Sequence, residues 1–388
     1  MKARIGFVGG GQLALMTAQE AERMRRDSGG DLDITINILD PEKNCPAHAL
    51  ASEHVVAGFS DPNGLQKLAS VSDIISYEIE LGDAGAIALL RDRGVVVRPS
   101  PETLGRIQDK FVQKRFLASR GIPVPRCVAV AAIVELGLPS MLKARRGGYD
   151  GRGNYLLRVK DDVEKGYARL GGKELVLEEF IPWTEEVSVI AARDERGKVS
   201  AFPVGENIHE EGILRLTAIP ARTTPEVAAS AERVAGQVLE AFGDIGVFGV
   251  EMFVRDGEVL VNEVAPRVHN TGHGTLERDA FPTSQFEQHM RAVTGMPFGE
   301  TTQRLPVVMH NILGEDNGYQ GRYRYEGLAQ AEALGARMHL YGKAEVRPRR
   351  KMGHLSLVGE RLNAKGEVDR LVERAERARS MVRIVGVE

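Results

Sequence analysis

Short apolar segments alternate with helical segments over the first hundred residues. Residues 4–8 form a predicted buried strand, and a helix is expected from about Gln12 to Arg26, directly after a run of glycines. Further strands are predicted at 34–39, 55–57, 73–78 and 95–97, with helices near 63–69 and 84–93 between them. Strands that alternate with helices fold into a parallel, doubly wound sheet. We therefore predict an α/β chain that begins with a Rossmann-like domain over residues 1–100.

The turn after the first strand has two possible functions. Gly9, Gly11 and Ala14 have the spacing of a dinucleotide-binding turn, and Asp40 ends the second strand. A nicotinamide-dependent dehydrogenase is therefore one interpretation. However, any fold of this kind uses such a turn to pass from strand to helix, and the N–H groups at a helix N-terminus bind any phosphate. Binding of ATP or of NAD, measured by thermal shift, would distinguish the two.

Length and charge narrow the class of protein. The 388 residues are enough for two to three domains, and the formal net charge of −3 gives no general affinity for nucleic acid or an anionic membrane. The two cysteines, Cys45 and Cys127, cannot form a metal-binding cysteine pair and argue against a disulfide framework. Glycines interrupt any signal-peptide core, and no apolar run reaches the roughly 18 residues of a membrane span. We expect a soluble cytoplasmic protein.

A glycine-rich, basic loop lies between two apolar segments within 142–157. Lys143 ends the first segment, Tyr155 begins the second, and the loop carries Arg145, Arg146 and Arg152. Glycine allows backbone N–H groups to approach phosphate oxygens closely. The loop is not a Walker A sequence, because no Gly-Lys-Ser/Thr follows the glycines. We predict a hairpin over an anionic ligand, the alternative being a surface hairpin with solvated arginines.

Two further strands carry acidic residues. Glu251 lies in a predicted strand at 247–254, and Asn262 and Glu263 lie in its partner at 259–264, after an Asp-Gly turn. Oxygen ligands on two neighbouring strands suit Mg²⁺, which takes its remaining ligands from water and phosphate.

Other polar groups have weaker patterns. Glu178 and Glu179 near the end of a strand at 175–181 are either solvated or form a hinge that accepts hydrogen bonds from adenine and ribose. Asn207, His209 and Arg215 are placed on a connection between strands. His269, His273 and Glu277 are four residues apart, but a zinc site would need them on one helix, and Asn270-Thr-Gly272 interrupts it.

A chain with a Rossmann-like domain, then a glycine-rich hairpin, then two acidic strands resembles members of the ATP-grasp superfamily. Within it, several blocks are similar to the 5-(carboxyamino)imidazole ribonucleotide synthase family: Gly9–Leu13, Arg98–Pro101, Arg146–Gly153, Glu186–Ser188, Glu206–His209, Asn262–Arg267, Thr283–His289, Leu340–Lys343 and Arg350–His354. The chain departs from the family pattern at Glu78–Gly82 and at Gly274. The resemblance implies an ATP-grasp domain over 101–300, with a lid sub-domain at about 126–180, and a small C-terminal domain over 301–388.

The resemblance also implies a reaction. ATP and bicarbonate would give carboxyphosphate, whose carboxyl group passes to the amine of aminoimidazole ribonucleotide in purine biosynthesis. The implied cofactors are ATP and Mg²⁺, and a homodimer with possible hand-over of the product to a downstream mutase is expected. The other interpretations are a formate-dependent glycinamide ribonucleotide transformylase, whose Pro-Arg-x-His loop is similar, and a non-catalytic nucleotide-binding regulator.

The family pattern assigns expected roles to residues of this chain. ATP would be held by Lys110, Lys143, Gly148, Tyr149, Asp150, Gly151, Arg152, Gly153, Asn154, Glu178, Glu179, Phe180, Ile181, Glu186, His209, Asn262 and Glu263. Glu251 and Glu263 would bind Mg²⁺. The ribonucleotide would contact Gly10, Gly11, Gln12, Glu78, Asn270, Lys343, Arg350 and Lys351. The expected catalytic residues are Arg267, which would hold bicarbonate, together with Asp150 and Lys343.

Overall fold

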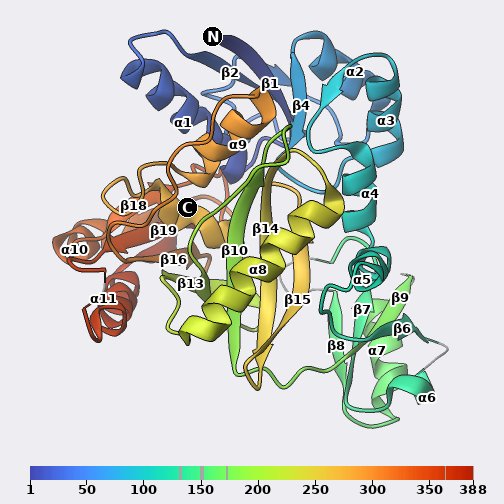
Figure 1. Cartoon of the computed structure of the whole chain (residues 1–388). Helices are drawn as coiled ribbons and strands as arrows, with labels where there is room; N and C mark the ends of the chain where they lie inside the picture. Colours follow the sequence, from blue (N-terminus) through green and yellow to red (C-terminus); the bar gives the residue numbers. More distant parts are fainter. Residues whose placement is uncertain (131–132, 149–152, 172–173, 363, 388) are drawn as a thin grey trace.

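The structure, a computed structural model, describes residues 1–130, 133–148, 153–171, 174–362 and 364–387, without the side chains of 133 and 134. The chain forms three sheets of four or more strands, with helices packed around them (Figure 1). Among these described residues, no helix has both the length and the apolar character needed to cross a membrane.

The N-terminal sheet is parallel, as predicted. Its strand order is β3-β2-β1-β4-β5, and its elements are β1 (Lys2–Val8), α1 (Gln12–Asp27), β2 (Asp33–Leu39), β3 (Glu53–Val55), α2 (Pro62–Ser70), β4 (Ile74–Tyr77), α3 (Ala84–Asp92) and β5 (Val96–Val97). Successive strands are added on one side of β1 up to β3 and on its other side from β4, so the strand order reverses between β1 and β4. Open α/β sheets bind ligands at such a point, beyond the carboxyl ends of their strands. The Rossmann-like prediction is confirmed, although β3 begins two residues before the predicted strand.

A separate four-stranded antiparallel sheet contains the glycine-rich hairpin. Helices α4 (Pro101–Gln108) and α5 (Lys110–Ser119) lead into it, and its strand order is β6-β9-β7-β8. The elements are β6 (Cys127–Ala129), α6 (Ile133–Leu136), β7 (Ser140–Ala144), β8 (Asn154–Leu157), α7 (Asp162–Leu170) and β9 (Leu175–Glu179). Lys143 on β7 pairs with Asn154 on β8, so the predicted hairpin is confirmed. We call this unit the lid sheet.

The largest sheet has nine strands and forms the body of the molecule. It runs in the order β15-β14-β10-β12-β13-β16-β19-β18, with β11 paired to β10. Its strands are β10 (Glu185–Arg193), β11 (Val199–Ala201), β12 (Gly205–Glu210), β13 (Ile213–Ile219), β14 (Gly246–Arg255), β15 (Glu258–Ala265), β16 (Val307–Leu313), β18 (Arg337–Leu340) and β19 (Lys351–Val358). We call it the central sheet. It continues without a break past residue 300, and the predicted domain limits stay predictions.

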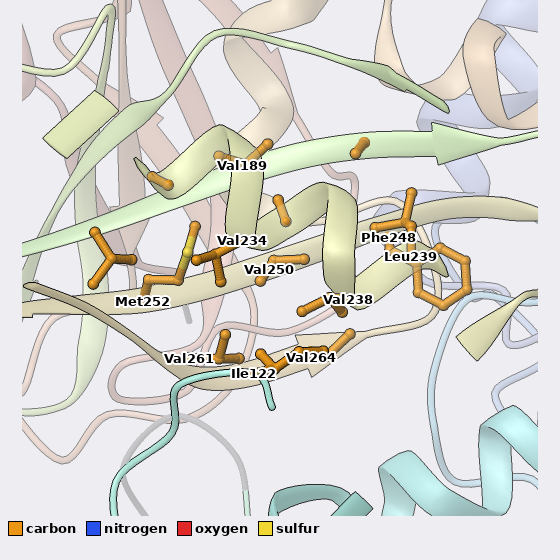
Figure 2. Packing of buried hydrophobic residues seen from close by; sticks show 14 of the residues in the cluster. Ile122, Val189, Val234, Val238, Leu239, Phe248, Val250, Met252, Val261 and Val264 are labelled. Atoms are coloured by element: carbon orange, nitrogen blue, oxygen red, sulfur yellow. The ribbon is translucent and has the colours of Figure 1, made fainter. Parts of the chain in front are cut away.

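Helix α8 (Pro225–Phe242) covers one face of the central sheet (Figure 1). It begins at Thr224, whose hydroxyl accepts the N–H of Val227, and ends at Gly243, where φ is 66°. Its apolar side chains at helical spacing lie against those of the sheet, as Figure 2 shows for Val238 and Leu239. The burial of this face fixes the strands β10, β14 and β15 that carry the acidic residues.

The remaining elements close the C-terminal half. They are the 3₁₀ helix η2 (Asn270–Leu276), α9 (Gln285–Thr294), β17 (Tyr323–Glu326), α10 (Leu328–Ala333), α11 (Glu367–Met381) and β20 (Arg383–Gly386), of which β17 and β20 pair with each other. One prediction is wrong here. Asn207 and His209 lie on β12 and Arg215 lies on β13, rather than on a connection, because the antiparallel hairpin extends the central sheet.

Candidate active site

A cleft of about 1290 Å³ lies where the three sheets meet. It is lined by most of the residues that the sequence predicted: Gly11, Gln12, Glu78, Lys110, Lys143, Gly148, Gly153, Asn154, Glu178, Glu179, Phe180, Ile181, Glu186, His209, Glu251, Asn262, Glu263, Arg267, Asn270, Lys343, Arg350 and Lys351. Among the described candidates, Gly10 alone does not line the cleft. A Cβ atom at Gly10 would lie 2.6 Å from Sγ of Cys45, so Gly10 packs behind the cleft wall. The predictions for 149–152, including Asp150, fall outside the described residues.

Two glutamates face each other in the middle of the cleft. Glu251 on β14 pairs in register with Glu263 on β15, and a β-bulge follows at Asn262. Successive residues of a regular strand point to opposite faces, whereas a bulge changes the direction of a side chain. The bulge therefore allows both Asn262 and Glu263 to line the cleft. The sequence contained no signal for this bulge.

The charges around this pair suit a divalent cation. Burial, together with the neighbouring charges of Glu263 and Glu186, raises the pKa of Glu251 to about 7. Although desolvation acts the other way, the Lys110 ammonium, 2.7 Å from Oε2 of Glu263, lowers the pKa of that carboxyl. Two adjacent carboxylates repel each other, and a cation between them would relieve this repulsion. Their oxygen donors, with the amide of Asn262, fit Mg²⁺.

The described residues form no site that would bind a metal ion through protein side chains alone. No group of three or more His, Cys, Asp or Glu side chains in the described part of the chain is placed to hold a metal ion. The residues of the zinc alternative diverge: Nε2 of His269 lies 3.2 Å from Glu251, whereas Glu277 binds Arg337 and His339.

The glycine-rich hairpin needs glycine for a steric reason. Gly148 and Gly153 lie opposite each other across the loop, and a Cβ atom at Gly153 would come 2.8 Å from Cα of Gly148. Next to the loop, Lys143 reaches from β7 to the Glu178 carboxylate on β9. The base of the lid sheet is held by Arg145, whose Nη2 donates to Oδ2 of Asp109 over 2.6 Å, directly before α5.

The segment Glu178–Ile181, which we call the hinge, connects the lid sheet with the central sheet. Glu178 is buried and lies between two lysine ammonium groups, those of Lys143 and Lys114. Glu179 instead pairs with Arg255, 3.2 Å away. Trp183 lines the cleft after the hinge and stacks on Phe253 with 4.7 Å between ring centroids. Trp183 was not among the predicted site residues. Its aromatic side chain was the only sequence feature that could have indicated a place in the site.

A carboxylate–imidazole pair lies beyond the hinge. Oε2 of Glu186 on β10 is 2.8 Å from Nδ1 of His209 on β12. Although burial opposes it, the Glu186 carboxylate raises the pKa of His209. The pair therefore offers both an acceptor and a donor to a bound ligand.

The opposite end of the cleft combines the N-terminus of α1 with cations from the C-terminal half. Oε1 of Glu78, after β4, accepts the N–H of Leu13 over 3.2 Å, and burial raises the pKa of Glu78 to about 7. Burial and the charge of Arg350 lower the pKa of Lys343 to about 8. Arg350 lies 3.6 Å from Glu42, and Lys351 and Asn270 also line this end.

Arg267 lies between the two ends of the cleft. Its Nε is 2.8 Å from Oε1 of Glu80, and its Nη2 donates to Oε2 of Glu80 over 3.1 Å. Nη1 donates to the carbonyl of Val268. These contacts fix the plane of the guanidinium group. Glu80 was noted in the sequence only as part of a departure from the family pattern.

The nicotinamide interpretation fits this site poorly. The carboxylate of Asp40 is mostly buried and accepts the N–H groups of Gly10 and Glu42, at 2.9 and 2.8 Å. In dinucleotide-binding domains the corresponding acid is open to the ribose.

A parallel N-terminal sheet, a lid sheet with a glycine-rich hairpin, and paired glutamates on a larger sheet define an ATP-grasp enzyme. Family models agree: a ribonucleotide synthetase preATP-grasp domain matches residues 1–108, an ATP-grasp domain matches 115–286, and a phosphoribosylaminoimidazole carboxylase C-terminal domain matches 307–367.

Comparison with known proteins shows to which family of ATP-grasp enzymes the chain belongs. N5-carboxyaminoimidazole ribonucleotide synthase of Brucella melitensis is 39% identical over 92% of this chain and 96% of its own length. The crystal structure of N5-carboxyaminoimidazole ribonucleotide synthetase from Thermotoga maritima has a TM-score of 0.87 and 39% identity, and the match covers 99% of this chain and 100% of that one. An Aspergillus clavatus synthase in complex with ADP and 5-aminoimidazole ribonucleotide has a TM-score of 0.84 and 29% identity, covering 97% and 99% of the two chains. This chain belongs to the N5-carboxyaminoimidazole ribonucleotide synthase family, and it is an ATP-grasp ligase.

Proposed function

We propose that this ligase carboxylates the amine of 5-aminoimidazole ribonucleotide, using ATP and bicarbonate. One observation carries the proposal: a single cleft holds paired glutamates at its centre, lysines of the lid side at one end, and a second set of cations at the other. Two separate cationic ends suit two phosphorylated substrates, with the reacting groups between them.

The nucleotide belongs at the lid end. Lys110, Lys143 and the backbone around Gly148, Gly153 and Asn154 would contact its phosphates, the hinge 178–181 would take the adenine, and Glu186 with His209 would take the ribose. Glu251, Glu263 and Asn262 would hold Mg²⁺, which supplies charge neutralisation at phosphate oxygens when bound. Phosphoryl transfer depends mainly on such positioning and charge.

The chemistry then has two steps. A bicarbonate oxygen attacks the γ-phosphorus and ADP leaves, giving carboxyphosphate. The amine nitrogen of the ribonucleotide next attacks the carboxyl carbon, phosphate leaves, and the amine loses a proton. Arg267 would hold the carboxyl and phosphate oxygens in both steps, since Glu80 fixes its fork. Asp150, which is expected to accept an N–H of this amine, lies outside the described residues.

The ribonucleotide belongs at the other end. Lys343, Arg350 and Lys351 would bind its phosphate, with the N-terminus of α1 at Gly11 and Gln12 close by. Glu78 and Asn270 would contact its ribose or ring. This arrangement favours a ribonucleotide acceptor.

Phosphate release measured with ATP, bicarbonate and aminoimidazole ribonucleotide tests the proposal. We expect release to require all three, and carboxylated product to form in equal amount. Release with glycinamide ribonucleotide and formate instead would favour the transformylase alternative. Nucleotide binding without turnover would favour the regulator. The cytoplasmic location, expected from the composition, stays a prediction, as do the homodimer and the hand-over to a mutase, which the family resemblance implies.

A further inference from the structure

Lys114 is a buried cation beside the nucleotide end of the cleft for which the mechanism above has no role. It lies on α5, one turn after Lys110, and 3% of its side chain is exposed. Its Nζ donates to the carbonyl of Val261 over 2.9 Å and lies 3.2 Å from Oε2 of Glu178. A charged side chain is seldom buried so completely unless its partners are specific.

The charges in this cluster do not balance. Two ammonium groups, those of Lys114 and Lys143, share one carboxylate, that of Glu178, so the cluster carries one surplus positive charge. Lys114 has a second partner in the Val261 carbonyl and does not line the cleft. Lys143 lines the cleft and is the more exposed of the two, at 10%. The surplus charge is therefore available at Lys143, on the side where the nucleotide phosphates would lie.

Lys114 also joins two sheets. Val261 belongs to β15 of the central sheet, whereas Glu178 belongs to β9 of the lid sheet. One ammonium group thus contacts both sheets, behind the surface that lines the cleft. Because both contacts are buried, they are little weakened by solvent.

We propose that Lys114 is a positioning residue for the nucleotide: it neutralises and holds Glu178, so that Lys143 can turn from Glu178 to the phosphate oxygens. This inference rests on the proposed function, because it assumes that a nucleotide occupies this end of the cleft. Without Lys114, the only other ammonium group in contact with Glu178 among the described residues would be that of Lys143. Leaving the pair would then cost the energy of an unpaired buried carboxylate.

The protonation states agree with this role. Burial lowers the pKa of Lys114 to about 8, so it remains charged at neutral pH. Burial alone would raise the pKa of Glu178, but the ammonium groups of Lys114 and Lys143 lower it to about 2. Cys127, whose thiol pKa burial raises to about 12, stays neutral beside them.

The test compares the two substrates in Lys114→Met, which keeps an apolar side chain of similar length. We expect the KM for ATP to rise about tenfold, the loss of about one charge-assisted contact, while the KM for aminoimidazole ribonucleotide changes less than about twofold. Lys114→Arg, which restores the charge, should recover most of the ATP affinity. Arg379→Met is the matched control, because Arg379 also donates to backbone carbonyls, those of Asn311 and Val382, but lies outside the cleft. It should leave both KM values unchanged.

A binding measurement separates this inference from the proposed function. Trp183 is the only tryptophan in the sequence and lines the cleft, so its fluorescence can report nucleotide binding without turnover. A wild-type enzyme that binds ATP but releases no phosphate would refute the proposed function and leave the role of Lys114 testable by the dissociation constant. An unchanged ATP affinity in Lys114→Met, or an equal rise in both KM values, would overturn the inference. If that variant does not fold, Lys114→Gln, which keeps a donor for Val261 without the charge, gives the same comparison.

Discussion

The ribonucleotide phosphate site can be tested at Lys343. In Lys343→Ala the ammonium group is lost from a cluster that includes Arg350 and Lys351 at one end of the cleft. A charge-assisted contact contributes about 1.5–3 kcal/mol. Lys343 is partly exposed, and solvent screening favours the lower part of this range. At about 1.5–2 kcal/mol, the KM for aminoimidazole ribonucleotide should rise roughly ten- to thirtyfold.

The assay is steady-state phosphate release with one substrate varied at a time. The KM for ATP should change less than about twofold, because the nucleotide lies at the other end of the cleft. Arg349→Gln is the matched control: Arg349 directly precedes Arg350 and also lines the cleft, but its guanidinium group is held by Asp316 and Glu211. It should leave both constants close to those of the wild type. A Lys343→Ala enzyme with an unchanged ribonucleotide KM, or with a raised ATP KM, would refute the reasoning.

Three further predictions follow from the same geometry. Glu263→Gln should lower phosphate release at least about a hundredfold without changing the melting temperature much, because the amide keeps the shape but loses the charge opposite Glu251; normal release would remove it from the metal site. In the wild type, kcat/KM for the ribonucleotide should fall as pH rises through about 8, because Lys343, which faces Arg350, Lys351, Glu78 and Glu42, loses its proton there. Lys343→Arg should abolish this fall. If the variant still showed it, the fall would belong to another group. Leu239→Ala should destabilise the protein by about 3 kcal/mol in denaturant unfolding, because Leu239 lies on the buried face of α8, against the central sheet, whereas Leu89→Ala, at an exposed position, should change stability by less than about 0.5 kcal/mol.

The elements that the sequence predicted well are those with strong local patterns. The parallel N-terminal sheet followed from strands that alternate with helices, and the hairpin of β7 and β8 followed from a glycine loop between apolar segments. The hairpin of β12 and β13 was missed because Ile208 is the one large apolar residue in β12, so this strand has no apolar–polar alternation to recognise.

The sequence predicted which residues line the site better than it predicted the contacts that those residues make. The pairing of Glu251 with Glu263 followed from two strands and a tight turn, but the bulge at Asn262 did not, because it depends on register. The burial of Lys114 and the Glu80–Arg267 contact join segments far apart in sequence, and no local pattern encodes them. Such contacts depend on how the three sheets are placed together.

The unbroken central sheet makes the enzyme difficult to divide. Strand β16 pairs with β13 from Leu216↔His310 to Ile219↔Val307, so the segment after residue 300 completes a sheet that begins before it. A fragment ending there would leave β13 as an open edge, with unpaired N–H and C=O groups beside the apolar side chains of Leu216 and Ala218. Such an edge recruits strands from other molecules. We therefore expect a shortened chain to aggregate, and crystallographers or engineers who want an isolated nucleotide-binding module should keep the C-terminal strands.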